Sequence, residues 1–264
     1  MSVAAKVGAQ LPYLRRYARA LTGSQSAGDA FVRATLEAAL ADASLLEQVS
    51  SGRVPLYAAF NRIWSSAQIE ITEPAMVDGF HERAAQKRLS RMTPLYRQAL
   101  LLTTLEDFSV AEAAQIIGKN SAEVDALIIV AMSEIDREST TDVLIIEDEP
   151  LISMQLEGLV TDLGHIVVGT AATRKQAQQI FADNRPGLVL ADIQLADGSS
   201  GIDAVEDILK FGDVPVIFIT AFPEKLLTGD RPEPTYLVTK PFQEATVRAA
   251  ISQALFFRSS RPLD

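Results

Sequence analysis

The chain has 264 residues, of which 48% are hydrophobic; it has no cysteine and a formal net charge of −10. These values exclude disulfides and thiolate metal sites, and the apolar runs are too short to span a bilayer. Residues 1–10 lack the basic start and long apolar stretch of a signal peptide, so we expect a cytoplasmic protein with no membrane segment. Residues 1–138 carry 14 Lys and Arg against 16 Asp and Glu (−2), and residues 139–264 carry 10 against 18 (−8). Neither half therefore has the basic surface that is typical of DNA-binding domains.

Up to about residue 138, apolar residues recur at helical spacing and β-branched runs are rare. Thr93 and Ser109 are N-cap candidates, and Glu112 would complete a capping box with Ser109. Gly118 fits a helix stop, and Ser121 fits the start of the next helix. Helices are therefore predicted at residues 11–21, 27–41, 55–65, 82–90, 94–105, 110–117 and 122–136.

Changes in pattern along the chain predict several domains. The stretch after residue 65 is polar, weakly periodic and contains Pro74 and Gly79, which favours a linker at 66–81. This linker would join two helical lobes, at 1–65 and 82–138. A third domain is expected at 139–264, after a joint at 138–141.

From Asp142 onward, strand-like and helix-like segments alternate. Pro150 is typical of a first helical turn, and Gly164 of a helix end. Residues 223–234 are rich in Pro and Gly, so any helix there should be short. Strands are predicted at 142–146, 166–170, 187–191, 215–219 and 235–238, and helices at 150–163, 175–184, 202–211 and 242–257. This alternation predicts an α/β fold with a doubly wound, five-stranded parallel sheet.

Polar side chains follow four of these strands. The carboxyl ends of parallel strands meet at one edge of a sheet, where ligands bind, so we expect these side chains to converge. Mg²⁺ prefers oxygen ligands. The side chains of Asp148 and Asp192 and the backbone carbonyl of Gln194 could supply them. Glu147 could bind the ion directly or through a water molecule. The hydroxyl of Thr220 could donate to a phosphoryl oxygen, and Lys240 could form an ion pair with Asp192. The residues at this edge are Glu147, Asp148, Asp192, Gln194, Thr220 and Lys240.

Four short motifs, at residues 145–150, 190–193, 219–221 and 239–242, resemble those of response-regulator receiver domains in type, order and spacing. The resemblance covers residues 142–257. It implies the strand order 2-1-3-4-5, Mg²⁺ as cofactor, Asp192 as phosphoacceptor, and a histidine kinase or phosphotransfer protein as phosphate donor rather than an enzymatic activity. Receivers usually carry an aromatic switch residue three positions before the lysine, where this chain has Leu237; Phe222 is a possible substitute.

The helical half resembles ECF-type sigma factors: residues 11–21 are similar to region 2 and residues 89–135 to region 4, with a helix-turn-helix. Direct readout of DNA needs basic and amide side chains on the recognition helix. Ser121 to Met132 has no Lys, Arg, Asn or Gln, but has Glu123 and Asp125. Direct DNA binding is therefore not expected.

A sigma-like half ahead of a receiver is similar to the PhyR family along essentially the whole chain. This resemblance implies a phosphorylation-activated anti-anti-sigma factor of the general stress response. Its sigma-like half would pack on the receiver at rest, and would sequester a helical anti-sigma factor of the NepR type once Asp192 is phosphorylated. Candidate contacts for this partner are Phe31, Leu36, Leu127 and Met132. The alternative is a DNA-binding response regulator or an ECF-type sigma factor that acts directly at promoters.

Overall fold

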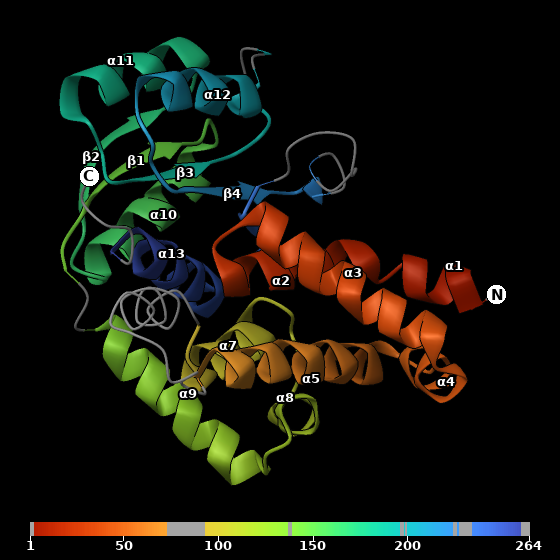
Figure 1. Ribbon diagram of the computed structural model, residues 1–264. Helices are drawn as coiled ribbons and strands as arrows, with labels where there is room; N and C mark the ends of the chain where they lie inside the picture. Colours follow the sequence, from red (N-terminus) through yellow and green to blue (C-terminus); the bar gives the residue numbers. More distant parts are fainter. Residues whose placement is uncertain are drawn as a thin grey trace, which may run out of the picture. The chain divides into compact units, whose positions relative to one another are not determined.

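The protein was analysed as a computed structural model (Figure 1), in which residues 3–72, 93–136, 139–195, 198, 200–223, 226 and 234–259 are described. The chain divides into two compact units, one formed by Met1–Ala131 and one by Met132–Ser259, and each is described by itself. In these described residues, no helix is long and apolar enough to cross a membrane. The predicted helix at 82–90, residues 73–81 of the predicted linker and most of 223–234 lie outside the described residues.

The first unit is helical, as predicted. The helices at 11–21, 27–41, 94–105, 110–117 and 122–136 are confirmed to within a few residues at their ends, and a helix is also found at 55–65 but is longer than predicted. Two short helices were missed, and the helix that starts at Arg53 runs on to Thr72, so the first part of the predicted linker is helical. The described helices before β1 (Asp142–Ile146) are α1 (Val3–Gly8), α2 (Leu11–Thr22), α3 (Gln25–Ala41), α4 (Ala43–Ser50), α5 (Arg53–Thr72), α7 (Leu95–Thr104), α8 (Val110–Ile117) and α9 (Ser121–Ile135); the last four residues of α9 belong to the second unit.

The predicted capping box at the start of α8 is confirmed. The Ser109 N–H donates to Glu112 Oε2 at 2.9 Å, and the Glu112 N–H donates to Ser109 Oγ at 3.3 Å. Gly118 ends the helix with φ 68°, a left-handed conformation that glycine adopts easily. The turn from Gly118 leads into α9, whose first turn is capped by Asn120: its side chain accepts the Glu123 N–H at 2.9 Å. The sequence therefore does form a helix-turn-helix.

The prediction that Thr93 caps α7 by its side chain is wrong. Pro94 occupies the N-cap position, with no hydrogen bond from a side chain. The Thr93 hydroxyl instead donates to the backbone carbonyl of Leu21, at the end of α2, at 2.5 Å. Residues this far apart in sequence leave no local pattern from which their contact could be predicted.

A buried set of charges, which we call the Glu106 cluster, joins α2, α5 and the turn after α7. Glu106 Oε1 accepts from Arg16 Nε at 2.9 Å, and Oε2 accepts from Arg53 Nη2 at 2.8 Å and from the Tyr57 hydroxyl at 2.7 Å. The Glu106 side chain is 0% exposed. Burial raises the pKa of Tyr57, and the charge of Glu106 adds to that rise. Both oxygens of the buried carboxylate are thus fully occupied by donors.

An aromatic core fills the space between α2, α3 and α5. The rings of Tyr17 and Phe60 lie 5.9 Å apart, and the ring of Phe31 meets Trp64 edge-on at 4.9 Å. Trp64 is the only tryptophan of the chain, and it is 4% exposed. Edge-on contacts of this kind add to the stabilisation from burial.

The second unit is the predicted α/β fold, with strand order β2-β1-β3-β4-β5 and all pairs parallel. Helices α11 and α12 cover one face of the sheet, and α10 and α13 cover the other (Figure 1). The strands are β1 (Asp142–Ile146), β2 (Ile166–Ala171), β3 (Leu188–Ala191), β4 (Val216–Thr220) and β5 (Tyr236–Thr239), and the helices are α10 (Pro150–Asp162), α11 (Arg174–Asn184), α12 (Gly201–Phe211) and α13 (Glu244–Ser259). Each predicted strand is confirmed to within one residue at each end.

Burial on both faces explains why the central strands read as continuous apolar runs. All four residues of β3 are buried. Leu237 of β5 is 1% exposed and packs in the core cluster that holds Phe181 of α11 and Ile208 of α12. Its neighbour Tyr236 instead donates to the carbonyl of Gln253, in α13, at 3.4 Å. Leu237 and Tyr236 therefore lie on opposite faces of the sheet, as strand geometry predicts.

Candidate functional site

The register of the parallel strands places the predicted site residues side by side. Ile146 of β1 pairs with Ala191 of β3, so the residues that follow them lie next to each other at the carboxyl edge. The Asp192 N–H continues this ladder by donating to the Ile146 carbonyl at 2.8 Å. In the same way, the Lys240 N–H donates to the carbonyl of Thr220 at 2.8 Å, just beyond the paired ends of β4 and β5.

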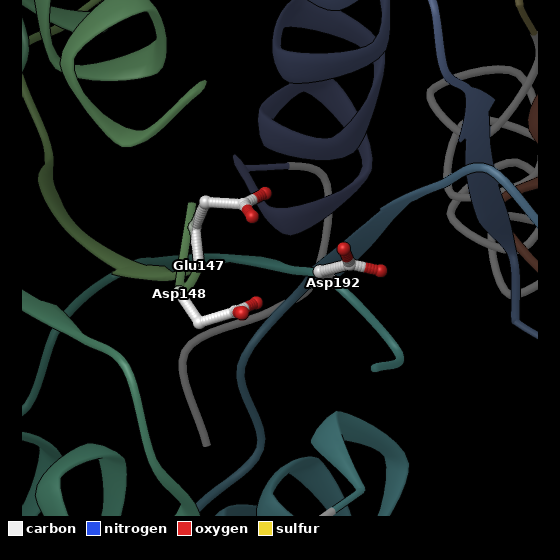
Figure 2. A group of neighbouring side chains, drawn as sticks. All are labelled: Glu147, Asp148 and Asp192. Carbon is white, nitrogen blue, oxygen red and sulfur yellow. The ribbon is translucent and has the colours of Figure 1, made fainter. Parts of the chain in front are cut away.

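Three carboxylates meet at this edge and form what we call the acidic pocket. One oxygen each of Glu147, Asp148 and Asp192 can be chosen so that all three lie within 4.8 Å of one another. Figure 2 shows Glu147 and Asp148 leaving the end of β1, and Asp192 leaving the end of β3. Glu147 and Asp192 are buried, and Asp148 is half-buried.

Lys240 bridges two of these carboxylates. Its Nζ lies 2.7 Å from Asp192 Oδ2 and 2.7 Å from Glu147 Oε2, with Glu149 Oε1 further away at 3.8 Å. The expected ion pair with Asp192 is therefore present, while the contact with Glu147 was not anticipated. The Lys240–Pro241 peptide bond is cis.

The pKa values of the bridge reflect a competition between burial and charge. Burial raises the pKa of Glu147, and the favourable contacts with Lys240 do not outweigh it. Burial acts on Lys240 in the direction of a lower pKa, but hydrogen bonds to Asp192 and Glu147 outweigh it, so the pKa of Lys240 is raised. Lys240 therefore stays positively charged, and the three carboxylates of the pocket outnumber this one cation.

The Asp192 carboxylate is fixed at both oxygens. Oδ1 accepts the Ile193 N–H at 2.5 Å and the Gln194 N–H at 3.3 Å, while Oδ2 faces Lys240. The fully buried Thr220 accepts the Phe222 N–H on its Oγ1 at 3.2 Å. That bond uses the hydroxyl oxygen as an acceptor, so the O–H of Thr220 remains able to donate to a ligand.

The donor set of the acidic pocket fits a divalent cation of the Mg²⁺ type. Its ligating atoms are all carboxylate oxygens, the class that Mg²⁺ prefers. Glu147, Asp148 and Asp192 sum to −3 and Lys240 to +1, which leaves −2. A divalent cation bound by these carboxylates would balance this charge.

The exposed surface of α9, at the recognition-helix position, is acidic and apolar. Ile129 is 68% exposed and Val130 is 51% exposed, beside the exposed Glu123 and Asp125. Lys119, just before the helix, is tied to Glu123 at 3.3 Å. This surface is unsuited to phosphates, because its side chains offer negative charge and apolar area.

Comparison with known families and proteins covers both units. Residues 7–61 match the Sigma2 domain of PhyR, residues 89–138 the sigma-like domain of the response regulator PhyR, and residues 143–252 the response regulator receiver domain. The phyllosphere-induced regulator PhyR of Methylorubrum extorquens is 52% identical over 261 residues, which span 98% of this chain and 97% of that protein.

Solved structures agree with this result. The crystal structure of the anti-anti-sigma factor PhyR from Bartonella quintana is 49% identical, covers 98% of this chain and 97% of its own, and has a TM-score of 0.84. A co-crystal structure of that protein with the anti-sigma factor NepR is 49% identical over 97% of this chain and 100% of its own, with a TM-score of 0.41. From the near full-length similarity to PhyR of Methylorubrum extorquens and to the crystal structure of PhyR from Bartonella quintana, we conclude that this chain belongs to the PhyR family of response regulators, with a sigma-like helical half and a receiver domain.

Proposed function

We propose that this protein is a phosphorylation-activated anti-anti-sigma factor of the general stress response. With Asp192 phosphorylated, the sigma-like half binds and sequesters a helical anti-sigma factor of the NepR type, which leaves the genuine sigma factor free. The main support for a protein partner is the surface of α9, which is acidic and apolar and therefore suits a protein rather than DNA. The relatives named as anti-anti-sigma factors support the same assignment.

The geometry of the acidic pocket supports the following roles for its residues. One oxygen of Asp192 attacks the phosphorus of a phosphohistidine on a kinase or phosphotransfer protein. The P–N bond breaks, its electron pair goes to the imidazole nitrogen, and an acyl phosphate forms. Thr220 donates its O–H to a phosphoryl oxygen, and Lys240 balances the added negative charge.

Mg²⁺ would be held by Glu147, Asp148, Asp192 and the backbone carbonyl of Gln194. When bound, it supplies charge neutralisation for the phosphoryl oxygens. Glu147 already accepts from Lys240 at 2.7 Å, so its oxygens serve both the lysine and the cation site. The roles of Gln194 and Thr220, and the contact between the two halves implied by family resemblance, stay predictions.

In this proposal, Thr220 is the first residue that transmits the phosphorylation state of Asp192 to the protein surface. A phosphate that draws the Thr220 hydroxyl toward itself weakens the bond from the Phe222 N–H. Phe222 is 41% exposed, whereas Leu237 is locked in the core. Phe222 is therefore better placed than Leu237 to report the state of Asp192 at the surface.

One binding assay tests the function against its alternative. Full-length protein, with and without beryllofluoride and Mg²⁺, is titrated with a NepR-type anti-sigma factor and, in parallel, with promoter DNA. We expect tighter binding of the anti-sigma factor in the activated state, no such gain for Asp192→Ala, and no promoter-specific binding. A response of Asp192→Ala equal to that of the wild type would overturn the gating. Specific promoter binding with a steep salt dependence would favour the direct transcriptional role, which the acidic α9 disfavours.

A further inference from the structure

Gly201, the first residue of α12, lies directly against the backbone of Asp192. A Cβ placed on Gly201 would overlap the carbonyl oxygen of Asp192 and would come within 2.9 Å of its carbonyl carbon and 3.3 Å of Ile193 Cα. All three obstacles are backbone atoms, so no change of rotamer can make room for a side chain. Only glycine permits this approach of two backbone segments.

Hydrogen bonds join the residues just after Asp192 to the residues at the start of α12. The Gly201 N–H donates to the Ile193 carbonyl at 3.0 Å, and Gln194 forms an antiparallel bridge with Ser200. The Ser200 hydroxyl then accepts the Ile202 N–H at 3.1 Å, as the N-cap of α12. The start of α12 therefore holds the backbone that follows Asp192 at several points.

This backbone in turn holds the Asp192 carboxylate. The Asp192 carbonyl, which faces Gly201, belongs to the same planar peptide group as the Ile193 N–H, so the two move together. That N–H donates to Asp192 Oδ1 at 2.5 Å. Any group that pushes the Asp192 carbonyl away from α12 must also turn the donor that orients the carboxylate.

We propose that Gly201 is a positioning residue for phosphorylation of Asp192. Its missing side chain lets α12 seat the Asp192–Ile193 peptide so that Oδ1 is held by backbone amides while Oδ2 stays on Lys240. The inference rests on the proposed phosphorylation of Asp192 and extends it to a residue that touches neither the phosphoryl group nor the cation. Misplacement of a reacting group by about 1 Å can cost on the order of a hundredfold in rate.

The chain offers a matched control in Gly158 of α10. Both glycines are helical residues of the same unit, but a Cβ on Gly158 would meet nothing within 4 Å. At Gly158, which lies inside α10, helix propensity favours alanine over glycine. Gly158→Ala is therefore expected to be harmless or stabilising, and Gly201→Ala to be harmful for the reason given above.

The experiment measures the rate at which acetyl phosphate labels the full-length protein at increasing Mg²⁺, followed by intact mass. We expect Gly201→Ala to label about tenfold more slowly or worse even at saturating Mg²⁺, at a temperature well below its unfolding transition. Gly158→Ala should label as the wild type does. A purely structural role would lower the unfolding temperature of Gly201→Ala but leave its saturating rate unchanged, and that result would overturn the proposal.

Two further readings keep the outcomes distinct. If the wild type is not labelled, or Asp192→Ala is labelled equally, the proposed function itself fails. If Asp192→Ala alone loses labelling and Gly201→Ala does not, only the positioning role fails. Should Gly201→Ala not fold, wild-type amide spectra decide: the Gly201 signal should shift with Ile193 and Gln194 on adding Mg²⁺ and beryllofluoride, while the Gly158 signal stays. An unresponsive Gly201 signal would refute the role.

Discussion

The two units each bury a carboxylate-centred set of charges, but the two sets are built in opposite ways. In the Glu106 cluster, one carboxylate faces two arginines and a tyrosine hydroxyl, and both of its oxygens are filled by donors at 2.7–2.9 Å. In the acidic pocket, three carboxylates lie close together, and a single lysine bridges two of them. The first set is complete within the chain, and the second carries an excess of negative charge.

This contrast separates a structural charge cluster from a binding site. A buried charge is tolerated where the fold supplies its partners. Glu106 has them, whereas burial keeps the pKa of Glu147 raised in spite of Lys240. The acidic pocket is therefore poised to gain from an added cation, and the Glu106 cluster is not.

Removal of Glu106 should have the largest effect. Glu106→Ala removes the acceptor of the Tyr57 hydroxyl and the carboxylate partner of the buried Arg16, which keeps its bond to the Leu105 carbonyl. Loss of one partner from a buried ion pair costs about 3–5 kcal/mol. Urea unfolding of the helical half should show this loss, and Mg²⁺ should not restore it. Glu37→Ala, an exposed position on α3, is the control. Equal stability of the two variants would show that the Glu106 cluster is not structural.

Removal of Lys240 should have a smaller effect, and one that Mg²⁺ repairs. Lys240→Met leaves Glu147 and Asp192 facing each other, and a loss of roughly 2–3 kcal/mol is expected, since the pocket can take up a proton instead. Thermal unfolding with and without Mg²⁺ measures it, with the exposed Lys175→Met of α11 as control. A loss that is independent of Mg²⁺ would contradict the view of the pocket as a cation site.

Mg²⁺ should stabilise the wild type through the acidic pocket. At ten times its dissociation constant, a ligand that binds only the folded state adds about 1.4 kcal/mol. Asp148→Asn should lose most of this gain at the same concentration, while Asp162→Asn, at the exposed end of α10, should keep it. Calorimetric titration gives the affinities directly. Unchanged Mg²⁺ binding by Asp148→Asn would remove Asp148 from the ligand set.

The smallest effect is expected at Asp29, which has its ion-pair partners within the chain but is only partly buried. Its carboxylate accepts hydrogen bonds from Arg15 and Arg19 at 2.9–3.2 Å, and its side chain is 24% exposed. Burial acts to raise the pKa of Asp29, but the hydrogen bonds and charges of the two arginines outweigh it, so its pKa lies below the ordinary 3.8. A lowered pKa gives stability that is present above pH 3.8 and is lost as the pH falls through the folded-state value. Stability measured against pH should therefore fall less steeply in acid for Asp29→Asn than for the wild type; parallel curves would exclude this role.

Sequence reasoning could place the acidic pocket but not the Glu106 cluster, and the reason is physical. The pocket residues each follow an apolar strand, and parallel strands gather those ends at one edge. Arg16 and Glu106 are separated by 90 positions and lie on elements whose packing has no sequence period. The available signal was Arg16, which lies among buried residues of α2, since a buried arginine needs a partner.

Short elements were missed for a similar reason. Helix α4 buries only Val49 and is set by its Asp42 cap, so it has almost no apolar period to detect. The partner candidates Phe31, Leu36, Leu127 and Met132 are each half-buried. Periodicity identifies an apolar face of a helix but does not tell how much of that face is exposed to solvent. Ile129 and Val130 are more exposed than the four candidates. Contacts of these residues with the anti-sigma factor stay predictions.

The single tryptophan gives the molecule a built-in optical reporter. Trp64 is packed against Phe31 in the sigma-like half, and the receiver has no tryptophan of its own. Tryptophan emission, excited at wavelengths that tyrosine does not absorb, therefore comes from the output half alone, although the chemical event takes place at Asp192. A change in emission when beryllofluoride is added can arise only if the signal leaves the receiver, so transmission can be followed in unlabelled protein and separated from phosphorylation itself.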